Sequence, residues 1–169
     1  MIEYVKTILT GQFEASICML NQCIQTCAPE HWEGKIANAT FRQIAYHTLF
    51  FVDLYLSLGE QAFKLRDLHH RGGDEQSDTG WSTGLARDET LSYVAICRQK
   101  ALETLASETL ESLERESGFS WLPFSRGELH LYNIRHVQHH TGQLSAYLRR
   151  VDHALKDSKG LRWVKTGWR

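Results

Sequence analysis

The longest helical pattern in this chain is SRGELHLYNIRHVQHHTGQLSAYLRRV, residues 125–151. Apolar and aromatic residues recur in it every three or four positions, which is the period of one face of an α-helix. Ser125 and Glu128 have the types and the spacing of a capping box, so we expect a helix from here to about residue 155. Two histidines belong to its apolar stripe rather than to the solvent face. The stripe consists of Leu129, Tyr132, His136, His140, Leu144, Tyr147 and Val151.

Three earlier segments have the same period and are predicted to be helices too. They are residues 2–27, 41–59 and 88–116. The first stops before Pro29, because proline cannot continue a helix. The second begins at a capping box made by Thr40 and Gln43 and ends at Gly59.

The segment between the second and third predicted helices, residues 60–87, is rich in Gly, Ser and Asp and has no apolar period. We expect a long loop there, which in a compact domain is more often functional than idle. No segment has a convincing strand pattern. The sequence therefore predicts an all-α fold, a four-helix bundle with a long loop between its second and third helices.

The composition is that of an ordinary globular protein, with 19 Lys and Arg, 20 Asp and Glu, and 42% hydrophobic residues. This balance argues against a disordered or strongly charged chain, and without a basic helix face we expect no nucleic-acid partner. A chain of 169 residues can bury a core of its own, so we expect residues 1–169 to form a single domain.

The N-terminal segment MIEYVKTILTGQFEASICML contains Glu3 and Lys6 among its apolar residues, which argues against a signal peptide and a membrane span. We therefore expect a cytoplasmic protein. The four cysteines lack C-x-x-C spacing, and buried reduced thiols are the favoured interpretation, although two of them lie one helical turn apart and could bind a metal. They are Cys18, Cys23, Cys27 and Cys97.

His136 and His140 have H-x-x-x-H spacing, which places two imidazoles one turn apart, with about 5 to 6 Å between Cβ atoms. That distance suits two bonds to one metal ion. His47 lies in the apolar stripe of the second predicted helix and could supply a third bond. A lone core histidine is usually satisfied by a backbone carbonyl, but a buried pair has four ring nitrogens to satisfy and is harder to explain by packing.

Two familiar metal motifs are excluded by residue type. A zincin has glutamate directly after its first histidine, and here that position is Val137. Ferritin-like di-iron proteins need Glu-x-x-His on two helices, and no glutamate in this chain has a histidine three residues later.

The histidines and their neighbours resemble the DinB-like (DinB/YfiT) metalloprotein superfamily. Its hallmark is one histidine on the second helix and an H-x-x-x-H followed by a Gly-Gln-apolar run on the last. His47 matches the first part, and HVQHHTGQL, residues 136–144, matches the second. The chain length, the four helices and the long connection agree as well, so the resemblance covers nearly the whole chain. Thr141 departs from the family, which often has arginine at that position.

The resemblance implies a divalent transition metal, zinc or nickel foremost, held by His47, His136 and His140. Imidazole ligands suit iron and copper as well, so the residues themselves do not choose the metal. The resemblance also implies that the second and fourth helices approach each other. It further implies a homodimer, which the tail residues Trp163 and Trp168 would allow.

For activity, the resemblance implies a metal-dependent enzyme that activates a low-molecular-weight thiol or water and acts on a small molecule, as a thiol S-transferase or a hydrolase. The alternatives are a non-catalytic metal-binding stress-response protein and a bundle with structural histidines. No catalytic residue is assigned. The general-base candidates are His69, His70 and His139; Gln43 and Asn133 could hold an imidazole, although structural hydrogen bonding is the favoured role for both.

Overall fold

The computed structural model of the protein describes residues 1–73, 82–152 and 161–168. Within these residues the regular structure is almost entirely helical, as the sequence predicts. The long helices are α1 (Ile2–Thr26), α2 (Phe41–Tyr55), α4 (Arg87–Ser107) and α6 (Arg126–Val151). The short elements are the 3₁₀ turns η1 (Pro29–His31) and η2 (Glu60–Ala62), the helices α3 (Asp67–Gly72) and α5 (Leu110–Glu114), and an antiparallel pair of strands, β1 (Lys35–Ile36) and β2 (Ala39–Thr40).

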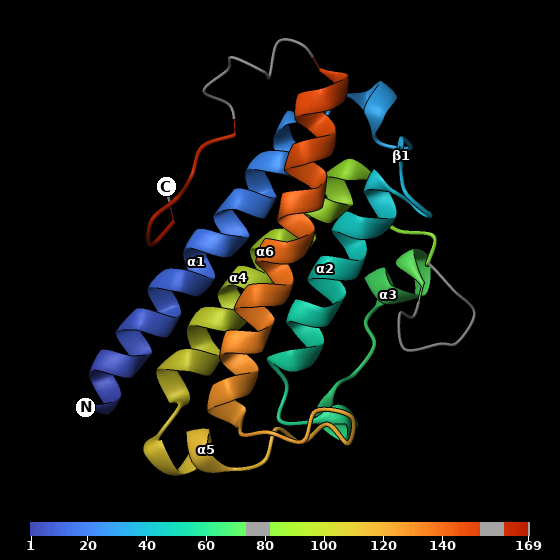
Figure 1. The fold of residues 1–169 in the computed structure, drawn as a ribbon. Coiled ribbons are helices and arrows are strands. Elements are labelled where there is room, and N and C mark those ends of the chain that lie inside the picture. The colour runs from blue at the N-terminus through green and yellow to red at the C-terminus, as the bar shows by residue number, and fades with distance from the viewer. Residues whose placement is uncertain (74–81, 153–160, 169) are drawn as a thin grey trace.

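The long helices share one core, and helices that are neighbours in space are not always neighbours in the chain. Helix α1 packs against α4 and α6, and α2 packs against the same two helices (Figure 1). Helices α1 and α2 therefore lie diagonally opposite each other. The expected approach of α2 and α6, the two helices that carry the three histidines, is present in the structure.

The start of α2 is the one that the sequence predicts. The Thr40 side chain accepts a hydrogen bond from the Gln43 backbone N–H at 3.3 Å, and the Gln43 side-chain oxygen accepts one from the Thr40 N–H at 2.8 Å. This reciprocal pair satisfies two of the N–H groups that every helix start leaves without a partner inside the helix. It thereby sets the residue at which α2 begins.

The end of α2 differs from the prediction, because the helix ends at Tyr55 rather than at Gly59. Gly59 adopts a φ of 137°, and Gly118 of the segment before α6 has a φ of 83°. The two glycines touch: a Cβ on Gly118 would lie 2.7 Å from the Gly59 Cα, which is too close for any real side chain. The glycine therefore serves a close approach of two backbones and not a helix cap.

The predicted third helix is in fact two helices, α4 and α5. Between them Glu108 is extended, and its buried carboxylate turns inward toward α6. It accepts a hydrogen bond from Arg126 Nε at 2.6 Å, and His130 Nε2 lies 2.9 Å from the same oxygen. Thr109 then starts α5 by accepting a hydrogen bond from the Ser112 N–H. The break in the helix allows this buried ion pair to form.

The long connection after α2 is more ordered than the sequence suggests, because η2 and α3 lie within the predicted loop. A helix of six residues is too short to show an apolar period, which explains the error. The remainder of the predicted loop, residues 74–81, lies outside the described residues.

A buried carboxylate on α2, Asp53, attaches α3 to the helices beneath it. Its oxygens receive hydrogen bonds from Lys100 Nζ at 2.5 Å and from the Tyr93 hydroxyl at 3.1 Å. His69 of α3 lies 2.8 Å from the same hydroxyl through Nε2, and its Nδ1 accepts the Arg66 N–H. Since a buried charge is tolerated only when it is paired and hydrogen-bonded, this group determines where α3 lies.

The C-terminal segment, residues 161–168, returns to α1. Trp168 packs on the core, and the Arg98 guanidinium lies 4.5 Å from the centre of its ring. Trp163 is 74% exposed, so of the two tryptophans in this segment only Trp168 packs against the helices.

All four cysteines are buried and free, and burial raises the pKa of Cys23 and of Cys27 to about 12. Both are therefore protonated thiols at neutral pH, in agreement with the prediction of reduced buried thiols. None of the helices in the described part of the chain combines the length and the apolar character that crossing a membrane requires.

Candidate metal centre

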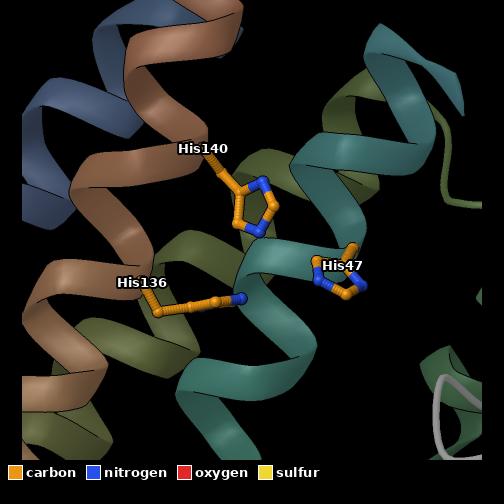
Figure 2. A group of neighbouring side chains, drawn as sticks. All are labelled: His47, His136 and His140. Carbon is orange, nitrogen blue, oxygen red and sulfur yellow. The ribbon is translucent and has the colours of Figure 1, made fainter. Parts of the chain in front are cut away.

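The three histidines singled out by the sequence meet between α2 and α6. His136 and His140 extend from α6 toward α2, where His47 faces them (Figure 2). The ring centres lie 5.4 Å apart for His47 and His136, 4.9 Å for His47 and His140, and 4.6 Å for His136 and His140. One nitrogen of each ring lies within 4.8 Å of the corresponding nitrogens of the other two.

This geometry suits a metal ion. Tetrahedral zinc with Zn–N bonds near 2.0 to 2.1 Å holds its nitrogens about 3.4 Å apart, so modest side-chain rotations would bring the three rings to ligand distance. The group contains no carboxylate or thiolate, and among the described residues no fourth His, Cys, Asp or Glu joins it. A metal held there would keep a position for a further ligand, as catalytic zinc sites do.

A hydrogen bond orients His140. Its Nδ1 lies 2.8 Å from Oε1 of Gln143, three residues later on α6. Because an amide oxygen can only accept, the proton is on Nδ1, and Nε2 is the unprotonated nitrogen, which is the form that a metal binds. The side chain that fixes the tautomer of His140 is therefore Gln143.

His136 is not the hydrogen-bonded core histidine that packing alone would favour. Its Nδ1 is buried without a hydrogen-bond partner among the described residues. Burial, followed by the neighbouring His140, His47 and His139, lowers its pKa to about 2. A neutral imidazole can bind a metal without first losing a proton, so His136 is available as a ligand at neutral pH.

Aromatic rings enclose the inner side of the histidine cluster. The Phe51 ring centre lies 4.8 Å from that of His47 and 5.6 Å from that of His136. Tyr55 lies next to His136 and to Tyr132, and burial raises its pKa well above the ordinary value, so its hydroxyl stays protonated. These rings lower the local polarity, which strengthens electrostatic interactions at the site.

On its outer side the cluster meets an open cleft of about 640 Å³ that runs along α6. His136 belongs to both the cluster and the cleft. The lining residues are Tyr132, Ile134, Arg135, His136, Gln138 and His139. A small molecule in this cleft would therefore lie beside His136, the member of the cluster that lines it.

Of the three general-base candidates, only His139 lies at the site, where it lines the cleft with its ring 4.9 Å from that of His140. His69 is buried and hydrogen-bonded in the Asp53 group, so it cannot serve as a base at the cleft. His70 is exposed on α3.

The side chains considered as imidazole holders have the structural roles that we favoured. The Gln43 amide donates to the Ser82 carbonyl at 2.9 Å, and that of Asn133 donates to the Val52 carbonyl at 3.4 Å. Sequence reasoning missed Gln143 in this role. The signal was its position three residues after His140, on the same helical face.

These features define the class of the protein: an all-α chain in which two long helices bring together three histidines able to hold a metal ion. The family model of the DinB superfamily matches residues 12–144, and the chain belongs to that superfamily. Comparison with curated proteins gave no match. Comparison with solved structures gave none either.

Proposed function

We propose that His47, His136 and His140 bind one divalent transition metal ion, zinc or nickel foremost, in a four-helix bundle of the DinB type. The observation that carries this proposal is the convergence of three imidazoles from two helices, with ligand nitrogens within 4.8 Å of one another. The hydrogen bond from His140 to Gln143 supports it, because it holds the ring proton on Nδ1, so that Nε2 is the unprotonated nitrogen that could bind a metal.

The proposed activity is metal-dependent transfer or hydrolysis, in which a low-molecular-weight thiol or water attacks a small molecule. Three neutral ligands leave the ion its full charge, so when bound it would lower the pKa of a thiol or water at the open position. His136 lines the cleft, so a small molecule bound there would lie next to the proposed metal position, and the rings of Phe51 and Tyr55 pack against His136.

The second candidate is a non-catalytic metal-binding protein of the stress response. A site that only stores or senses metal has no need of a cleft. The cleft shared with His136 therefore favours the enzyme.

Three wider features belong to the same proposal. Residues 1–169 form a single domain, the protein is cytoplasmic, and it acts as a homodimer. For the last of these, the exposed ring of Trp163 offers apolar surface that a second copy of the chain could cover.

Metal analysis of the purified full chain, without a metal-binding tag, tests the proposal. We expect about one equivalent of a transition metal per chain, and little in His47→Ala and in His136→Ala. His70→Ala is the matched control, because it removes an exposed histidine of α3 and should retain the metal. A parent protein that binds no metal even after reconstitution, or ligand variants that bind as much as the parent, would reject the site.

A further inference from the structure

One arginine at the cleft has no partner for its charge. Arg135 is exposed on α6, directly before His136, and both residues line the cleft. Among the described residues nothing forms an ion pair or a hydrogen bond with its guanidinium. The residues one turn away on α6 cannot neutralise it, because none is acidic. They are Leu131, Tyr132, Gln138 and His139.

Most other arginines of the described chain are engaged. Arg126 pairs with buried Glu108, Arg98 with Glu14, and exposed Arg115 with Glu111. Backbone carbonyls accept from further arginines, such as Arg87 and Arg149. The unpaired guanidinium at the cleft is therefore a departure from the pattern of this molecule.

The charge of the cleft has one sign. No carboxylate is among its lining residues, and the polar groups beside Arg135 are the Gln138 amide and the His139 imidazole. The proposed ion would add two further positive charges with no anionic ligand to offset them. A ligand that spans the open metal position and Arg135 would meet positive charge at both ends.

The lining also contains apolar surface. Tyr132 and Ile134 are half-buried in the cleft wall, and Tyr132 is continuous with the aromatic rings behind His136 through Tyr55. Such a wall suits a short apolar body between two polar ends.

From these observations we propose that the centre takes a small carboxylate-bearing ligand, whose carboxylate is bound by Arg135 while its thiol or other donor group reaches the metal position. This inference rests on the metal site proposed above and deepens it. A guanidinium binds a carboxylate through two parallel N–H bonds, so Arg135 would select for the anion as well as orient it. It is a binding residue and takes no part in bond making.

Two thiols of nearly equal size test the proposal on the full chain reconstituted with Co²⁺, whose thiolate complex absorbs light. The probes are 3-mercaptopropionate and 3-mercaptopropanol, which differ in the charge at the end away from sulfur. We expect the parent to bind the carboxylate probe about tenfold more tightly, the size of effect that a charge-assisted hydrogen bond at a partly open site supports. The preference should weaken as salt is added, because exposed charges are screened.

The variant Arg135→Gln should bind 3-mercaptopropanol as the parent does and lose the preference for the carboxylate. Arg115→Gln is the matched control, because it removes an exposed guanidinium directly after the short helix α5, outside the cleft lining, and should keep the preference. Equal affinity of the parent for the two probes would overturn the proposal, and so would a preference that persists in Arg135→Gln, since the metal charge alone would then account for it. Failure to bind Co²⁺, or bound Co²⁺ that neither thiol perturbs, would instead refute the metal site with its open position, and this inference with it.

Discussion

Replacing Gln143 by leucine should weaken metal binding while leaving the fold intact. The substitution removes the oxygen that accepts the His140 Nδ1 proton at 2.8 Å. Without that acceptor the ring can turn, or it can carry its proton on Nε2, where it blocks the metal. The Gln143 side chain is exposed, so its loss leaves no cavity in the core.

The expected size of the effect follows from this contact. Hydrogen bonds that orient metal-bound histidines are worth roughly tenfold to a hundredfold in metal affinity. That range corresponds to about 1.4 to 2.8 kcal/mol. We place Gln143→Leu toward the lower end, because the bond lies at an exposed edge of α6 where water can replace the lost oxygen.

Competition with a chromophoric chelator measures the affinity, and nitrogen NMR of the metal-free protein reports which ring nitrogen of His140 carries the proton. Gln143→Glu is the matched variant, because it keeps an acceptor oxygen and should bind metal at least as tightly as the parent. The reasoning is refuted if the Gln143→Leu variant binds metal with the parent affinity and its His140 ring still carries the proton on Nδ1.

Three further predictions concern stability. Burial alone would raise the pKa of Glu108, but its hydrogen bonds and the Arg126 charge outweigh burial and lower that pKa from 4.5 to about 2. The stabilisation of the folded protein by the Glu108 carboxylate is therefore full above pH 4.5 and is lost as the pH falls toward 2. Urea unfolding at several pH values should show this loss in the parent and a weaker one in Glu108→Gln. Asp53→Ala should cost about 3 kcal/mol in urea unfolding, since it leaves the Lys100 charge half-buried and unpaired; a cost below about 1 kcal/mol would contradict the role given to this carboxylate. Gly118→Ala should lower the melting temperature, because its Cβ would overlap Gly59, whereas Gly142→Ala, which meets no atom within 4 Å, should not.

The sequence is most informative where the physical cause is local. The capping box of Thr40 and Gln43 was predictable because two side chains three residues apart satisfy the N–H groups of the same helix start. The end of the same helix was less predictable. Gly59 resembles a helix cap in the sequence, and only its contact with Gly118 shows that it serves another purpose.

The same distinction applies at the third predicted helix. Its apolar period continues across Glu108, so the sequence gives no reason to divide it. At the division, the carboxylate of Glu108 meets Arg126 and His130 of α6, which are 18 and 22 positions further along the chain and so outside the helical period. His69 is a similar case. The sequence allowed it as a general base, but in the structure its ring is buried and hydrogen-bonded to Tyr93, away from the cleft.

For the histidine site, the sequence by itself determined the pair His136 and His140, because the helical repeat places residues four apart on one face whatever surrounds them. It also placed His47 on an apolar face of its helix. Only the tertiary structure decided that α2 and α6 are neighbours, that Gln143 orients His140, and that a cleft with an unpaired Arg135 opens beside His136. The helical period depends on residues within a turn or two of one another, whereas these contacts depend on how whole helix surfaces pack.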